Sequence, residues 1–422
     1  MRNAFLAWLI VVMLPAAGAG VERDEDTLLT LRNLSREALD ANPEIRAATQ
    51  SVLAARGRLR QAGLLDAPEL MYMREEMPGF RWQEAMKQRV GLYQMVRFPT
   101  KLTGQGDIAG VQEHQTYLLQ REKENEILSR VRASLADLWG AQENVRLNAE
   151  SERLLRQVAE IAASRIGVGR GTLEDALKTS VEISRTANRA DILRQQEMSA
   201  RAMLAALLNR PAGTLAGRAV LDTIPQVNLR ADSLLEKALA SRPLIMRDSL
   251  MMAEGDIMVA QASREYLPDL RLGLEYVTQP MTSFTGWTVV ATLSLPIVPW
   301  SIGRAGGMAE EAEAWKRRSE ADYEASRSMV SAAVRDLYYR CRSRLEQLRS
   351  YREQILPESR RSLQASITAY QAGTSDILMV LDAHRMFVDL SMEAIEARMS
   401  FEQSLAELER TVGTTLDYDT GR

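Results

Sequence analysis

The chain of 422 residues contains one cysteine, Cys341, and two histidines, His114 and His384. A single cysteine forms no disulfide within the chain, and so few thiol and imidazole groups leave little material for a metal centre or a nucleophile. Cys341 lies on an apolar stripe with helical spacing, which indicates a buried thiol that packs as a small hydrophobe. We therefore expect no cofactor, no bound metal and no enzymatic activity.

The chain also lacks a large excess of charge of one sign and has no long hydrophobic run. The 53 basic and 56 acidic residues leave a net charge of −3, which argues against a nucleic-acid partner. No apolar run reaches the length of a membrane-spanning helix. If this chain crosses a membrane, it must do so as a β-barrel.

The first residues carry an export signal. Arg2 is followed by a short apolar run, residues 4–14, and by small residues that end at Gly20. This pattern is typical of a secretory signal peptide, so we expect residues 1–20 to be removed. No cysteine follows the apolar run, so we expect the exported chain to carry no lipid.

The remaining chain repeats itself at a spacing of 200 residues. "ALDANPEI" begins at Ala38 and "ALASRPLI" at Ala238, and Pro68 and Pro99 match Pro268 and Pro299 without a gap. A match that keeps its register through several prolines indicates a tandem duplication. We divide the chain into a first unit, residues 21–226, and a second unit, residues 227–422.

Both units predict the same elements. A helix comes first, at residues 34–63 and 232–266. A β-hairpin follows, at about 68–98 and 268–298, and apolar and polar residues alternate along its segments over about ten residues. A very long helical hairpin ends each unit, about 103–210 and 303–412, with apolar residues at steps of three and four. Two hairpins supply only four strands, too few to close a barrel, so three chains that pool twelve strands are the economical solution.

These residues resemble the TolC-like family of outer-membrane efflux proteins, nearest its heavy-metal branch. The resemblance rests on the duplicated "NPEI…RLRQAGLLDAPEL" opening, on "FPTKL" from Phe98, and on a motif at both helix-hairpin turns. That motif reads "VGRGTLEDALKTS" from Val168 and "YQAGTSDILMVLDAHRMF" from Tyr370.

The resemblance implies a mixed, mainly α-helical fold: a homotrimeric channel-tunnel with a twelve-stranded barrel in the outer membrane of a Gram-negative bacterium and a long α-helical barrel in the periplasm. It implies a passive exit duct for substrates delivered by an inner-membrane pump of the RND type through a periplasmic adaptor protein.

The resemblance also assigns residues at the periplasmic end. The turns fall at Gly169, Gly171 and Gly373, and the gate acids and tyrosine fall on Asp175, Tyr370 and Asp382. Ser375 and Met379 depart from the family pattern, since they replace an arginine and an aspartate. The alternative is that the acids only cap or solvate a helix turn.

Two wider alternatives stay open at this point. The chain is either this channel or a periplasmic coiled-coil scaffold without a membrane barrel. Its cargo is either metal ions, which thioethers such as those of Met71 and Met73 suit, or drugs and other small organic molecules.

Overall fold

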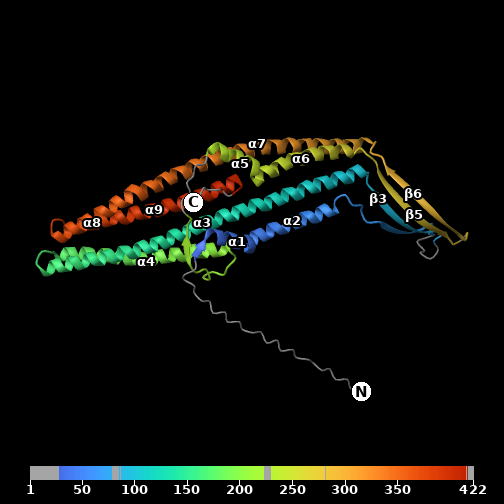
Figure 1. Cartoon of the computed structure of the whole chain (residues 1–422). Helices are drawn as coiled ribbons and strands as arrows, with labels where there is room; N and C mark the ends of the chain where they lie inside the picture. Colours follow the sequence, from blue (N-terminus) through green and yellow to red (C-terminus); the bar gives the residue numbers. More distant parts are fainter. Residues whose placement is uncertain are drawn as a thin grey trace, which may run out of the picture.

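The computed structural model describes residues 28–77, 85, 87–222, 230–280, 282–414 and 416. Long helices run side by side over most of an elongated molecule, and a β-sheet lies beyond one end of them (Figure 1). The expected signal peptide, residues 1–20, and most of the loop between the first two long strands lie outside the described residues.

The elements of the first half precede residue 230, and those of the second half follow it. In order, they are β1 (Leu28–Thr30), α1 (Leu31–Ala41), α2 (Pro43–Gln61), β2 (Glu69–Glu75), β3 (Lys87–Val96), α3 (Pro99–Gly167), α4 (Leu173–Leu207) and β4 (Arg218–Val220). The second half contains α5 (Ala231–Ser241), α6 (Pro243–Arg264), β5 (Asp269–Gln279), β6 (Phe284–Ser294), α7 (Pro299–Ser350), a π-helical turn η3 (Tyr351–Ile355), α8 (Leu356–Ala372) and α9 (Ile377–Val412).

The four long strands form one antiparallel sheet in the order β2-β3-β5-β6, and β1 and β4 pair in a small parallel sheet. The register of the long strands places alternate residues on opposite faces. One face is apolar and exposed in the single chain; its residues include Leu70, Tyr72, Val90, Leu92, Leu272, Leu274, Tyr276, Trp287, Val289 and Leu293. The opposite face carries charged side chains; they include Glu69, Glu75, Arg89, Arg271 and Glu275.

The single helices expected at residues 34–63 and 232–266 are each two helices. Asn42 interrupts the first because a residue before proline avoids the helical region, and its backbone is extended at φ −66° and ψ 127°. Its side chain caps α2 by accepting a hydrogen bond of 2.8 Å from the amide of Glu44. Arg242 interrupts the second at the equivalent position, with φ −67° and ψ 123°. The long helices begin at Pro99 and Pro299, a few residues earlier than expected, because proline suits the first helical turn.

Each long helix is accompanied by two shorter helices that follow one another along it. The 69 residues of α3 extend about 100 Å, and α4 and α2 pack along it, whereas α9 and α6 pack along α7. Side chains join the shorter helices where their ends meet: Asn42 Nδ2 donates to the carbonyl of Leu207 at 2.9 Å, and Ser241 Oγ donates to that of Val412 at 3.0 Å. In the described part of the chain, no helix combines the length and the apolar character of a membrane span.

The buried apolar side chains form three clusters. One joins α1, α3 and α4 of the first half, and one joins α5, α7 and α9 of the second half. The third brings both halves together near the helix-hairpin turns, where Val158 of α3 packs with Ile367 and Tyr370 of α8. Cys341 is buried in the second cluster, and burial raises the pKa of its thiol to about 12, so the thiol stays protonated at neutral pH.

Candidate functional site

Glycines make the two helix-hairpin turns at the end of the molecule that lies farthest from the sheet (Figure 1). Gly169 follows α3 with φ +74°, and Gly373 ends α8 with φ +80°, a left-handed conformation that favours glycine. Gly171 is needed for space, because a Cβ there would lie 2.8 Å from the amide nitrogen of Ile166. We call this end of the molecule, residues 151–185 and 363–385, the tip.

The structure brings Asp175 and Tyr370 together across the two hairpins. The Tyr370 hydroxyl donates a hydrogen bond of 3.0 Å to Oδ2 of Asp175, and Thr172 Oγ1 donates one of 2.7 Å to Oδ1. The Tyr370 side chain is only 1% exposed. Burial, followed by the hydrogen bond to Asp175, raises the pKa of Tyr370 to about 12, so the hydroxyl remains a donor over the whole physiological range.

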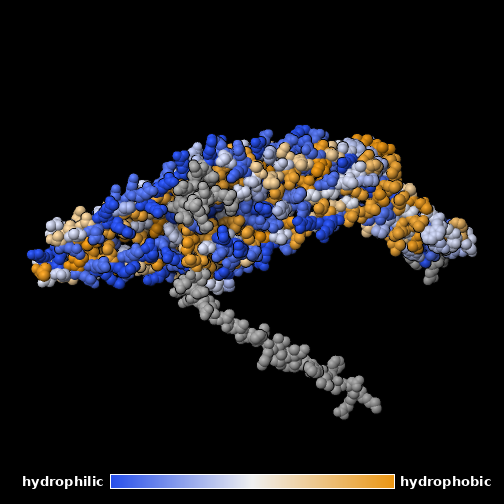
Figure 2. Space-filling view, viewed as in Figure 1, coloured by the Kyte–Doolittle hydropathy of each residue, from blue (hydrophilic) through white to orange (hydrophobic). Residues whose placement is uncertain are grey.

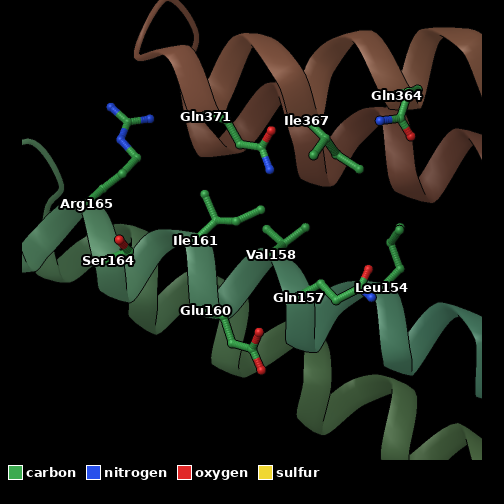
Figure 3. Close-up of a pocket in the computed structure, with 10 residues that line it drawn as sticks. All are labelled: Leu154, Gln157, Val158, Glu160, Ile161, Ser164, Arg165, Gln364, Ile367 and Gln371. Atoms are coloured by element: carbon green, nitrogen blue, oxygen red, sulfur yellow. The ribbon is translucent and has the colours of Figure 1, made fainter.

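Arg165 is a member of this contact that the sequence did not reveal. It reaches from the last turn of α3 toward α8 (Figure 3). Its Nη1 donates to the carbonyl of Tyr370 at 2.5 Å, its Nη2 donates to that of Arg170 at 3.1 Å, and its guanidinium lies 4.3 Å from the centre of the Tyr370 ring. Its position four residues before Gly169 was a local signal, because basic side chains often bind the carbonyls at a helix end.

The structure does not bring Asp382 into this contact. Asp382 is exposed on α9 and lines a second depression, about 640 Å³, between α4 and α9. In that depression Arg385 of α9 forms an ion pair with Glu182 of α4, which ties the two hairpins at a second level. Ser375 and Met379 lie in and just after the turn before α9, and Met379 is exposed.

A groove of about 600 Å³ runs between α3 and α8 (Figure 3). Apolar side chains form its floor, among them Val158, Ile161 and Ile367, and polar side chains form its rim, namely Gln157, Glu160, Ser164, Arg165, Gln364 and Gln371. The groove therefore presents an apolar strip bordered by hydrogen-bonding groups at the tip.

His384 also joins the two halves. Its Nε2 lies 2.8 Å from Oγ of Ser151 on α3, and both side chains are buried. Burial lowers the pKa of His384, so its ring is neutral at neutral pH. Within the described ranges, no group of three His, Cys, Asp or Glu side chains has the arrangement of a metal site.

Comparison with known proteins gives the context of this architecture. The model of the outer membrane efflux protein family matches residues 234–414. The cobalt-zinc-cadmium resistance protein CzcC of Cupriavidus metallidurans is 22% identical over 391 residues, which is 91% of this chain and 90% of CzcC. The chain is therefore similar to the outer membrane efflux protein family, through the family model over residues 234–414 and through CzcC over most of its length.

Solved structures of outer-membrane channels share the fold of this chain. The outer membrane protein VceC of Vibrio cholerae superposes with a TM-score of 0.77 at 16% identity, over 92% of this chain and 97% of VceC. CusC superposes with a TM-score of 0.75 at 18% identity, over 91% of this chain and 92% of CusC. The family is one of efflux proteins rather than enzymes, and the alternative of a periplasmic scaffold gains no support from these relatives.

Proposed function

We propose that this efflux protein is the outer-membrane channel of a tripartite efflux system and that three copies form one continuous tube. The observation that carries the proposal is the division of the β2-β3-β5-β6 sheet into an apolar, exposed face and a charged face. Alternation of this kind suits a barrel wall with lipid on one side and water on the other.

The edges of the sheet support a shared barrel. Among the described residues, β2 and β6 each pair with one neighbour only, so each has an open edge. In lipid, an unpaired backbone group costs several kcal/mol, so the edges must be closed. Two copies would give eight strands and an interior filled by side chains, whereas three give twelve strands and leave a lumen.

The charged face fits the wall of such a lumen. Glu275 is only 3% exposed and accepts hydrogen bonds from the Tyr93 hydroxyl and from Arg89 Nη1, the latter at 3.1 Å. Arg89 also pairs with Glu75. Because these pairs connect β2, β3 and β5, they hold the register of the strands while they face the water-filled side.

At the tip, we propose that the contact between Asp175 and Tyr370 closes the periplasmic end. It joins α4 to α8, so that the first hairpin is held to the second within one copy. Arg165 strengthens this closure by binding the Tyr370 backbone and covering its ring. In the trimer, three Asp175 and three Asp382 side chains would form acidic rings that favour cations over anions.

We also propose that the two halves arose by tandem duplication of units 21–226 and 227–422. The joints at Asn42 and Ser241 support this, because neighbouring positions of the two units hold the last carbonyls of α4 and α9 in the same way.

The proposed system also contains a periplasmic adaptor protein and an inner-membrane pump of the RND type. We assign no catalytic step to this chain.

Metal ions are the cargo we favour, and small organic molecules are the alternative. The reason is that CzcC, which aligns along nearly the whole chain, is a cobalt-zinc-cadmium resistance protein. A strain without this chain should lose resistance to cobalt, zinc or cadmium. If the strain keeps its metal resistance but becomes sensitive to drugs, the cargo is organic instead.

Reconstitution tests the channel itself. The detergent-purified protein should migrate as a trimer without heating and as a monomer after heating, and it should form discrete conducting channels in planar bilayers. A stable monomer that forms no pores would disprove the proposed function.

A further inference from the structure

The apolar face of the sheet is ordered in rows across its four strands. In the strand register, Tyr72, Val90, Tyr276 and Trp287 lie side by side, and the rings of Tyr276 and Trp287 are 5.2 Å apart. The next row toward the hairpin loops is polar and consists of Arg74, Gln88, Thr278 and Thr285. The next row toward the helices is entirely apolar and consists of Leu70, Leu92, Leu274 and Val289. The aromatic row therefore marks one edge of an apolar band.

The strands are too short to contain the whole band. Lipid-facing bands of outer-membrane barrels are about 25 Å tall, and their strands are tilted by about 40°. From Trp287 to the end of β6 at Ser294, seven residues rise about 18 Å along the membrane normal. A height of about 25 Å is reached only three residues later, at Ile297.

The segment after β6 is apolar and extended, as an apolar band about 25 Å tall requires. Leu295 and Ile297 continue the alternation of Trp287, Val289 and Leu293, and the backbone is still extended at Val298, with φ −88° and ψ 151°. Ile297 is 69% exposed in the single chain. Trp300, in the first turn of α7, is 77% exposed, more than Trp287 at 69%.

The surroundings of Trp300 continue the same surface. Exposed apolar residues also lie at the other junctions between helices and strands, at Leu64, Leu65 and Tyr266. Figure 2 shows apolar surface that runs from the sheet around the bend onto the start of the helices. Arg304, one helical turn after Trp300, is exposed and is the first charged residue of α7, and a cation beyond an aromatic side chain suits the anionic headgroups of a leaflet.

We propose that Ile297 and Trp300 lie in the interface of the periplasmic leaflet of the outer membrane, so that the first turn of α7 is part of the lipid-binding surface. The proposal rests on the outer-membrane channel proposed above. Phospholipid is the occupant because β5 and β6 continue the lipid-facing side toward the helices with apolar residues, namely Leu272, Ala291, Leu270 and Leu293, and Gln94 of β3 is the one polar residue in the row of Leu272. On the other side, the polar row beyond Trp287 ends this surface.

Three variants with one tryptophan each test this placement, with every other tryptophan replaced by phenylalanine. They keep Trp287 in the aromatic row, Trp300 at the proposed edge, or Trp315, which lies about 22 Å farther along α7. Each variant is reconstituted as a conducting trimer in phosphatidylcholine vesicles whose acyl chains are brominated close to the glycerol backbone. We expect Trp287 and Trp300 to lose comparable fractions of their emission and Trp315 to keep its emission.

The outcomes separate this inference from the channel proposal. Quenching of Trp287 without quenching of Trp300 would overturn the edge at Trp300, because another copy of the chain would then cover that side chain. Equal quenching of Trp300 and Trp315 would also overturn it, because the membrane would extend farther along α7. If both Trp287 and Trp300 keep their emission, the result would instead contradict the proposed β-barrel, because the apolar face of the sheet would not face lipid. If the multiple replacements do not fold, a Trp300→Phe variant of the otherwise intact chain should lose part of the lipid quenching, and unchanged quenching would overturn the inference.

Discussion

The hydroxyl of Tyr370 donates a hydrogen bond of 3.0 Å to the Asp175 carboxylate although 195 residues separate the two positions. The bond joins the turn of one helical hairpin to the turn of the other, and both partners lie at the end of the molecule remote from the sheet. The bond therefore links the two hairpins to each other within one copy of the chain.

Replacement of Tyr370 by Phe together with Asp175 by Ala should raise the single-channel conductance. A hydrogen bond to a charged group contributes about 1.5–3 kcal/mol, so in the proposed gate its loss should shift the equilibrium between closed and open tips roughly tenfold or more toward the open state. Planar-bilayer recordings measure this shift. Tyr339→Phe, the same change on the exposed side of α7, is the control and should leave the conductance unchanged. Equal conductance in the tip variant and the wild type would refute the gate.

Replacement of Arg165 by Gln should open the tip as well, since the side chain loses its stacking on Tyr370 and its charge-assisted bond to the Tyr370 carbonyl. Added to Tyr370→Phe, it should raise the conductance by less than the sum of the two single effects, because both changes weaken one contact. Arg153→Gln is the matched control, since Arg153 is exposed on α3 and, among the described residues, its hydrogen bond goes to the carbonyl of Ala149 in its own helix. Strict additivity of Arg165→Gln and Tyr370→Phe would show that Arg165 acts elsewhere.

Replacement of Gly273 by Ala should lower the temperature at which the trimer dissociates. A Cβ at Gly273 would lie 2.5 Å from Cε1 of Tyr93, so the ring must move away from the glycine and give up its bond to Glu275. Overpacking of this kind costs about 1–3 kcal/mol. Migration on unheated and progressively heated gels measures the change. Gly57→Ala, inside α2, where a Cβ meets nothing within 4 Å and alanine favours the helix, should not lower this temperature.

Cys341 should resist alkylation by iodoacetamide at pH 8 in the folded protein and react fully in denaturant. Burial raises the pKa of its thiol from 9.0 to about 12, so the reactive thiolate is absent at pH 8. The unfolded chain releases this proton at a lower pH than the folded chain does. The stability contribution is therefore complete below about pH 9 and is lost as the pH rises toward 12. Mass spectrometry counts the alkylated thiols, with an exposed Ser328→Cys variant on the same helix as the positive control. Rapid labelling of the wild type at pH 8 would contradict the buried position.

Local chemistry explains why much of the fold could be predicted. Alternation over ten residues specified the β-hairpins, steps of three and four specified the long helices, and glycines at 169 and 373 marked turns that need a left-handed residue. The division of the first helix at Asn42 also had a local signal, an asparagine followed by a proline. The prediction missed it because the apolar periodicity continues across both helices.

The residues that give the sites their geometry were not predictable in the same way. Arg165 reads as one of many basic residues on a charged helix, and only the packing of α3 against α8 places its guanidinium on Tyr370. Glu275 reads as a solvated strand residue, yet β3 supplies the two donors that hold it. Asp382 carries the expected carboxylate, but its helix directs it toward a different depression.

The sequence by itself determined the elements, their order and the two faces of each strand, because backbone preferences and side-chain periodicity act over a few residues. Only the tertiary structure decided which hairpin turn meets which, which carboxylate is buried, and where the apolar surface of the sheet ends. Those outcomes depend on contacts between residues up to about 200 positions apart, and no local preference specifies the geometry of such contacts.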